Sequence, residues 1–118
     1  MSETSFYQID AQASGVPQQF FAAYRNQQFV LFQIVQTGGD DQHNDGAVEV
    51  LYLLPAATAG DIPRVISHRL MDVKAARLLD EAHRPLLQRV RLLVSHPWTE
   101  MERGIVGVIL GVPPSEIA

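Results

Sequence analysis

The densest group of side chains that could bind a metal lies in the polar stretch 40–46, Asp-Asp-Gln-His-Asn-Asp-Gly. Asp41, His43 and Asp45 alternate and are followed by a glycine, as at the start of a calcium-binding loop. Such a loop needs a bidentate carboxylate seven residues after Asp45, where this chain has Tyr52. We therefore expect a polar hairpin loop here, with no bound metal and no cofactor.

The other residues that could perform chemistry match no known catalytic spacing. His68, His83 and His96 form no His-x-x-x-His pair, and no serine lies in a Gly-x-Ser-x-Gly turn. The chain has no cysteine, so thiolate catalysis, disulfides and cysteine-ligated zinc are excluded. Its glycines match no phosphate-binding loop. The sequence therefore predicts a protein that is not an enzyme.

Length and composition indicate one soluble globular domain over residues 1–118, with 47% hydrophobic and 19% charged residues. No apolar run approaches the roughly 20 residues that span a bilayer. The first five residues show neither the basic nor the apolar part of a signal peptide. We therefore expect a cytoplasmic protein that does not contact a membrane.

The first half of the chain predicts a short strand, a short helix and a β-hairpin. The strand covers residues 5–10, and the helix begins at Pro17 and places Phe20, Phe21 and Tyr24 on one face. Residues 29–36 and 46–55 are rich in β-branched and aromatic residues, and the polar loop between them predicts an antiparallel hairpin. Both strands are apolar on nearly both faces, so the chain's own helices or another subunit must cover the second face.

The second half predicts helices. Asp61 can cap the first, Pro63 suits its first turn, and apolar residues recur near helical spacing as far as Val94. Three helices are expected from residue 71 onward, at 71–82, 85–94 and 97–110, with Ser95 as the cap of the last one. Gly111 ends that helix, and 113–116 form one more turn. Residues 105–110 are apolar nearly all round, which predicts a buried segment.

These elements together predict an α+β fold. A short N-terminal strand and helix precede the β-hairpin, and a C-terminal bundle of three to four helices packs on the sheet. The expected single domain has an α/β sub-part at 1–55 and a helical sub-part at 61–118.

The expected helical part is also the basic part of the chain. Residues 64–91 hold seven Lys or Arg side chains against three acids. Two helices joined by a short turn at His83-Arg84 have a helix-turn-helix layout. Its second helix would carry Gln88, Arg89 and Arg91, which together with Arg84 are candidate contacts to DNA bases and phosphates.

The C-terminal segment resembles the end of the Ner-like phage regulators. The likeness rests on Ser95, Pro97-Trp98, Glu102-Arg103, Ile105 and the run Leu-Gly-Val-Pro-Pro-Ser-Glu-Ile at 110–117. These regulators are small, all-helical helix-turn-helix repressors that bind double-stranded DNA. The resemblance implies that residues 71–117 bind DNA and that 85–94 form the recognition helix.

The sequence therefore leaves three classes of function open. The first is a non-catalytic interaction or regulatory protein, a homodimer or a small subunit of an assembly, with Phe29, Leu31, Leu87 and Leu92 as candidate interface residues. The second is the DNA-binding regulator. The third is a ligand-binding domain or small enzyme that lines a pocket with Tyr7, Tyr24, Tyr52 or His43.

Overall fold

The computed structural model describes residues 3–35, 47–85, 87 and 89–118, and its main element is a six-stranded sheet. The helices and strands are β1 (Ser5–Ala13), β2 (Val16–Arg25), β3 (Gln28–Val35), β4 (Ala47–Pro55), α1 (Ile62–Arg69), β5 (Asp72–Leu78), β6 (Val90–Leu92) and α2 (Glu100–Leu110). Short 3-10 turns occur at Ala59–Asp61, Glu81–His83 and Pro114–Glu116.

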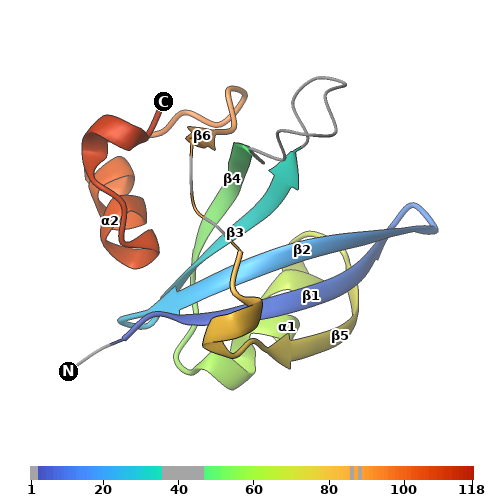
Figure 1. The fold of residues 1–118 in the computed structure, drawn as a ribbon. Coiled ribbons are helices and arrows are strands. Elements are labelled where there is room, and N and C mark those ends of the chain that lie inside the picture. Colours follow the sequence, from blue (N-terminus) through green and yellow to red (C-terminus); the bar gives the residue numbers. More distant parts are fainter. Residues whose placement is uncertain (1–2, 36–46, 86, 88) are drawn as a thin grey trace, which may run out of the picture.

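The strand order is β5-β1-β2-β3-β4-β6. Strands β1 to β4 form an antiparallel meander, β5 adds to it antiparallel to β1, and β6 lies parallel to β4. Two of the connections are two-residue turns with positive φ, at Ser14-Gly15 and at Asn26-Gln27. Such turns match the right-handed twist of the strands that they join. Figure 1 shows the strong curvature of the resulting sheet.

Each face of this sheet packs against a different helix. On one face Phe29 and Leu31 of β3 belong to a core cluster with Ile62 and Ile66 of α1. On the opposite face the alternate residues of β3 pack in a second cluster. That cluster contains Val30, Phe32, Val48, Val50, Val90, Leu92, Val106, Ile109, Leu110 and Ile117. In Figure 1, α1 lies behind β1 and β2, whereas α2 stands to the left of the sheet. The chain's own helices thus cover both faces.

Helix α2 and strand β6 are also hydrogen-bonded to the two ends of the described chain. Thr4 Oγ1 donates a hydrogen bond to the carbonyl of Ile109 at 2.6 Å. Ile117 pairs with Val90, and Ala118 exchanges backbone hydrogen bonds with Val90 and Leu92 at 3.0 and 3.1 Å. The outer edge of β6 is therefore hydrogen-bonded to residues 117–118.

The expected C-terminal helical bundle is wrong. Residues 72–78 form β5 instead of the helix expected at 71–82, and the helix expected at 85–94 is replaced by irregular backbone and β6. The bases of β5 recur every three residues at Lys74 and Arg77, which suggested the polar stripe of a helix. In the structure β5 is an exposed strand on which only Val73 is half-buried, so its sequence shows little alternation. The helical sub-part at 61–118 is wrong as well, because β5 and β6 complete the sheet.

The helix expected from Pro17 is also wrong, because residues 16–25 form β2. Phe20 and Ala22 point to the α1 side, whereas Phe21 and Ala23 point to the α2 side. Since both faces are covered from Phe20 onward, apolar residues follow one another there without a two-residue period. Pro17 is tolerated because β3 pairs with β2 only from Phe21 onward.

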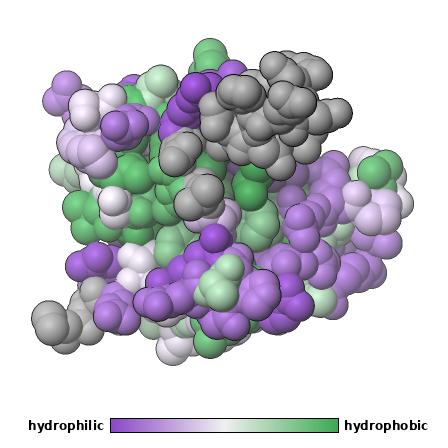
Figure 2. Space-filling view, viewed as in Figure 1, coloured by the Kyte–Doolittle hydropathy of each residue, from purple (hydrophilic) through white to green (hydrophobic). Residues whose placement is uncertain are grey.

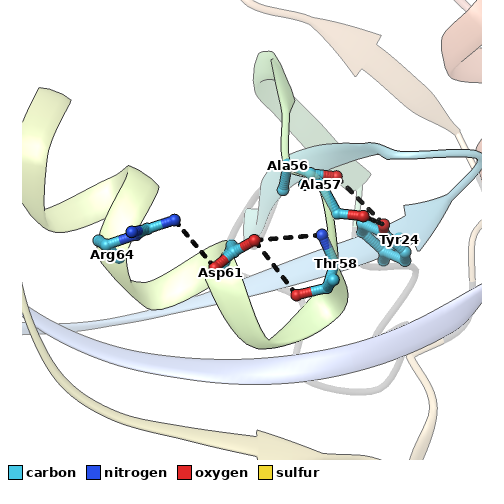
Figure 3. A network of polar contacts seen from close by, with 6 residues as sticks. All are labelled: Tyr24, Ala56, Ala57, Thr58, Asp61 and Arg64. Atoms are coloured by element: carbon cyan, nitrogen blue, oxygen red, sulfur yellow. Dashed lines mark hydrogen bonds and ion pairs between the residues drawn. The ribbon is translucent and has the colours of Figure 1, made fainter.

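Several expectations are confirmed. The strand at 5–10 lies in β1, and β3 and β4 form the antiparallel pair that residues 29–36 and 46–55 predicted. The helix after Asp61 exists but ends at Arg69, and the Asp61 side chain makes no capping hydrogen bond to it. Figure 3 shows that the Asp61 carboxylate accepts hydrogen bonds from Thr58 at 3.2 Å and from Arg64 at 3.0 Å. The polar loop at 40–46 lies outside the described residues.

Helix α2 begins at Glu100 and is capped by Thr99 rather than by the expected Ser95. The Thr99 hydroxyl accepts the N–H of Glu102, and the Glu102 carboxylate accepts the N–H of Thr99, at 3.1 and 3.0 Å. This reciprocal pair satisfies two backbone donors that a helix start otherwise leaves free. Gly111 ends the helix with a φ of 72°, as expected from the sequence.

Two glycines within α2 have different surroundings, and substitutions can distinguish them. A Cβ at Gly107 would lie 3.1 Å from the carbonyl oxygen of Val112, whereas a Cβ at Gly104 would meet nothing within 4 Å. We expect Gly104→Ala to raise the free energy of unfolding by up to about 1 kcal/mol, because alanine favours helix. Gly107→Ala lowers it by about 1–3 kcal/mol through crowding. Urea unfolding followed by circular dichroism measures both, and equal effects would contradict the packing described for α2.

Candidate interaction surface

The side of α2 that faces away from the core is apolar and exposed. Its buried side carries Val106, Gly107, Ile109 and Leu110. On the other side Met101 is 76% exposed and Val108 is 56% exposed, and the exposed Gly104 and Gly111 share this side. At about 100° per residue, these four residues fall within roughly 80° of arc. We call them the outer stripe of α2.

The outer stripe lies in a part of the chain without charge. No Asp, Glu, Lys or Arg occurs from Gly104 to Ser115. The charged residues of α2 are confined to its first turns, where Arg103 donates a hydrogen bond to the carbonyl of Ile117 at 3.4 Å. Figure 2 shows apolar residues gathered on the side of the molecule where α2 lies. An apolar helix face without charge is unusual on a surface that contacts only water.

The loop before α2 adds an aromatic group and another exposed apolar residue. The His96 ring lies edge-on to Trp98 with ring centroids 4.3 Å apart, and Tyr52 of β4 lies 6.3 Å from it on a similar edge contact. Trp98 Nε1 donates to the carbonyl of Leu93 at 3.0 Å, which fixes the indole. Val94, in the same loop, is 91% exposed.

One carboxylate at the start of α2 has a perturbed pKa. The hydrogen bond from the Thr99 backbone N–H is the main cause that lowers the pKa of Glu102 below the ordinary glutamate value. His96 Nε2 lies 3.6 Å from the same carboxylate and lowers the pKa further. Glu102 therefore caps the start of α2 in its charged, carboxylate form.

A second histidine lies in a small hollow elsewhere. The Asp80 carboxylate accepts the backbone N–H of His83 at 3.1 Å and contacts its ring Nδ1, and the bond to the His83 side chain lowers the pKa of Asp80. This hollow of about 180 Å³ is also lined by Arg77, Leu78 and Leu79. None of the described residues that line it carries a hydroxyl or thiol that an oriented imidazole could activate. Among the described residues, no three His, Cys, Asp or Glu side chains are placed to hold a metal.

The residues proposed for DNA contact are not presented on one helix. The Arg84 guanidinium lies over the Phe6 ring at 5.3 Å, and Arg91 pairs with Glu49 of β4 at 2.7 Å. Arg89 is exposed, with a φ of 55° between irregular backbone and β6. Gln88 lies outside the described residues. The described part of the chain contains no two-helix unit at 71–94 that could enter a groove of DNA.

Most of the candidate interface residues lie in the core. Phe29 and Leu31 have 0% exposed surface and Leu92 has 4%, because both faces of β3 and the inner side of β6 are covered. Leu87 is half-buried against the α2-side cluster. These positions serve the packing of the sheet, so the strands themselves provide no free apolar face.

The candidate pocket tyrosines are dispersed. The Tyr24 hydroxyl donates to the carbonyls of Ala56 and Ala57 at 3.1 and 3.2 Å and so fixes the turn that leads to α1 (Figure 3). Tyr7 and Tyr52 are half-buried against the α1-side cluster. His43 lies outside the described residues.

Sequence reasoning missed Met101, Gly104 and Val108 as surface residues. The apolar character of 105–110 predicted burial all round, which is wrong for Val108. The signal that could have found this surface is the glycine at 104, which interrupts a helix without being needed at its end.

No family model, curated protein or solved structure matches this chain. These comparisons do not test the resemblance of the C-terminal segment to the Ner-like regulators. Within the described residues, no helix is long and apolar enough to cross a membrane.

The lowered pKa of Glu102 predicts how acid affects α2. A carboxylate with a depressed folded-state pKa contributes stability that is present above its unfolded pKa, about 4.3, and is lost as the pH falls through the folded value. We expect the free energy of unfolding of Glu102→Gln to fall less than that of the wild type between about pH 6 and pH 2. Urea unfolding across this range tests the expectation. An identical pH dependence in both proteins would show that the charge of Glu102 does not support the cap.

Proposed function

We propose that this chain is a non-catalytic protein-interaction protein that docks through the outer stripe of α2. The observation that carries the proposal is the exposure of Met101 and Val108 on a helix whose opposite side is fully packed. Burying one such side chain contributes about 1.5–3 kcal/mol. A partner that covers both Met101 and Val108 therefore gains a substantial part of the free energy of binding.

The rest of the fold supports this choice of surface. The two faces of the sheet are covered, so their apolar residues need no partner. On the described strands, the exposed large apolar residues are Val16, Ile34 and Leu78, which lie on three different strands. In the outer stripe of α2, by contrast, the exposed Met101 and Val108 share one helix face with Gly104 and Gly111. The neighbouring loop adds the exposed Val94.

DNA binding and small-molecule binding receive less support from the described side chains. Arg84 and Arg91 have partners within the chain, which reduces the positive charge available to phosphates. None of the described hollows is lined by Tyr7, Tyr24 or Tyr52. Docking by α2 uses groups that have no other partner in the described fold.

A photo-crosslinking amino acid at position 101 tests the proposal in cells that naturally produce the chain. We expect irradiation to give a discrete protein adduct, because the side chain at 101 would lie against the partner. The matched control places the same group at Arg64 of α1, whose side chain is 79% exposed and so as accessible as Met101. Equal labelling from both positions, or none from position 101, would contradict docking through α2.

A further inference from the structure

We infer that the partner of α2 is a second copy of this chain, packed antiparallel across a two-fold axis at residue 106. This inference rests on the proposed function, because it names the occupant of the same surface. It is based on the order of large and small residues along the outer stripe, which is Met101, Gly104, Val108 and Gly111.

An antiparallel pair centred on residue 106 makes the outer stripe complementary to itself. In such a pair, residues at equal distances on either side of 106 face each other. Met101 then faces Gly111 of the second copy, and Val108 faces Gly104 of the second copy. Each large side chain lies opposite a residue without a side chain, as in the packing of knobs into holes. An isologous two-fold interface requires this kind of self-complementarity.

A parallel pair of α2 helices lacks this fit. It would place Met101 against Met101 and Gly104 against Gly104, so large residues would collide while the glycines left a gap. It would also bring the acidic first turns, with Glu100 and Glu102, close together. The antiparallel pair instead sets the positive end of each helix dipole beside the negative end of the other.

Gly104 provides an observation that is independent of the apolar exposure. A glycine in the middle of a helix costs about 1 kcal/mol relative to alanine. Gly107 is required by its approach to the Val112 carbonyl, and Gly111 by its φ of 72°. A Cβ at Gly104 would meet nothing within 4 Å, so the described fold gives no reason for this glycine. Close approach of a neighbouring α2 provides one.

The absence of charge favours a second copy over a charged partner. The outer stripe has no Asp, Glu, Lys or Arg, so two copies meet without repulsion between like charges. It also offers no ion-pair partner to an acidic or basic peptide. Glycine at 104 allows the helix axes to approach to the lower end of the usual range of about 8–10 Å.

Cysteine crosslinking tests this register, and the chain offers a clean background because it has no cysteine. We would make Gly104→Cys and Val108→Cys as separate proteins and oxidise each alone and as an equal mixture. In the proposed pair, residue 104 faces residue 108 of the second copy. Two residues 104, or two residues 108, are offset by about 6 Å along the axis, in addition to the lateral spacing. Disulfides need Cα atoms within about 7 Å, so the same-residue pairs are disfavoured.

We expect the mixture to give severalfold more disulfide-linked dimer than either variant alone, with one copy of each variant in the product by mass spectrometry. Crosslinking that is equal or stronger in the separate variants would overturn the antiparallel register. Urea unfolding of the reduced variants checks that both are folded, as expected for two positions that face solvent within one copy.

A second variant tests the gap at Gly104 without crosslinking. We expect Gly104→Leu to fill the gap and weaken self-association at least tenfold in sedimentation equilibrium, while the single copy stays folded. The matched control is His68→Leu, which adds the same side chain at an exposed position of α1. Unchanged association in Gly104→Leu would overturn the inference.

The outcomes separate this inference from the proposed function. If the wild type sediments as a monomer at all concentrations, while position 101 crosslinks to a different protein, the second copy is excluded and docking through α2 stands. If position 101 gives no adduct and the chain is monomeric, both proposals fall. A photo-adduct with the mass of two chains, together with the mixed disulfide, supports both.

Discussion

The fold depends on the need to cover both faces of one small sheet. The four residues 29–32 of β3 have no exposed surface at all, and they point alternately to opposite faces. A strand that is apolar on both faces is stable only in the middle of a three-layer arrangement. Helix α1 provides one outer layer, and α2 with Ile117 provides the other. Because each of these layers is a single short helix, no helix or strand of the described residues covers the outer side of α2.

The fold also places several charged side chains next to a side chain of opposite charge. These ion pairs join Arg64 with Asp61, Lys74 with Asp72 and Arg91 with Glu49, at 3.0, 2.9 and 2.7 Å. Exposed pairs of this kind contribute little to stability, but they reduce the local field that a polyanion would sense. The seven bases of residues 64–91 are divided among α1, β5, the irregular segment and β6.

The sequence predicted those elements whose residues determine local structure. The β3–β4 hairpin followed from two apolar runs around a polar loop, and the end of α2 followed from Gly111. Strands β2, β5 and β6 could not be predicted in the same way. In β2 both faces are covered from Phe20 onward, so the apolar period disappears there. In β5 nearly all residues are exposed, and Lys74 and Arg77 fall at helical spacing by chance. Non-local pairing with β1 decides the structure of β5, and no window of neighbouring residues contains that information.

Prediction of the candidate interaction surface from the sequence has the same limit. The residues of α2 indicate an apolar helix, but only the packing of Val106, Ile109 and Leu110 against the sheet shows that Met101 and Val108 face outward. The sequence alone does not distinguish the roles of Gly104 and Gly107, whereas the structure shows that their surroundings differ. The surface could therefore be assigned only after the neighbours of each residue were known.

The order of the strands has a consequence for how the chain acquires its fold. Strand β1 is made first, yet its edge partner β5 follows after β2, β3, β4 and α1, and Thr4 bonds to a carbonyl in α2. Contacts between such distant segments require large loops to close before they stabilise anything, which slows folding. During synthesis on the ribosome, the meander of β1 to β4 is therefore made before the elements that cover its two edges and its two apolar faces. The nascent chain, rather than the finished protein, is the state in which this sequence is most exposed to aggregation and most in need of a chaperone.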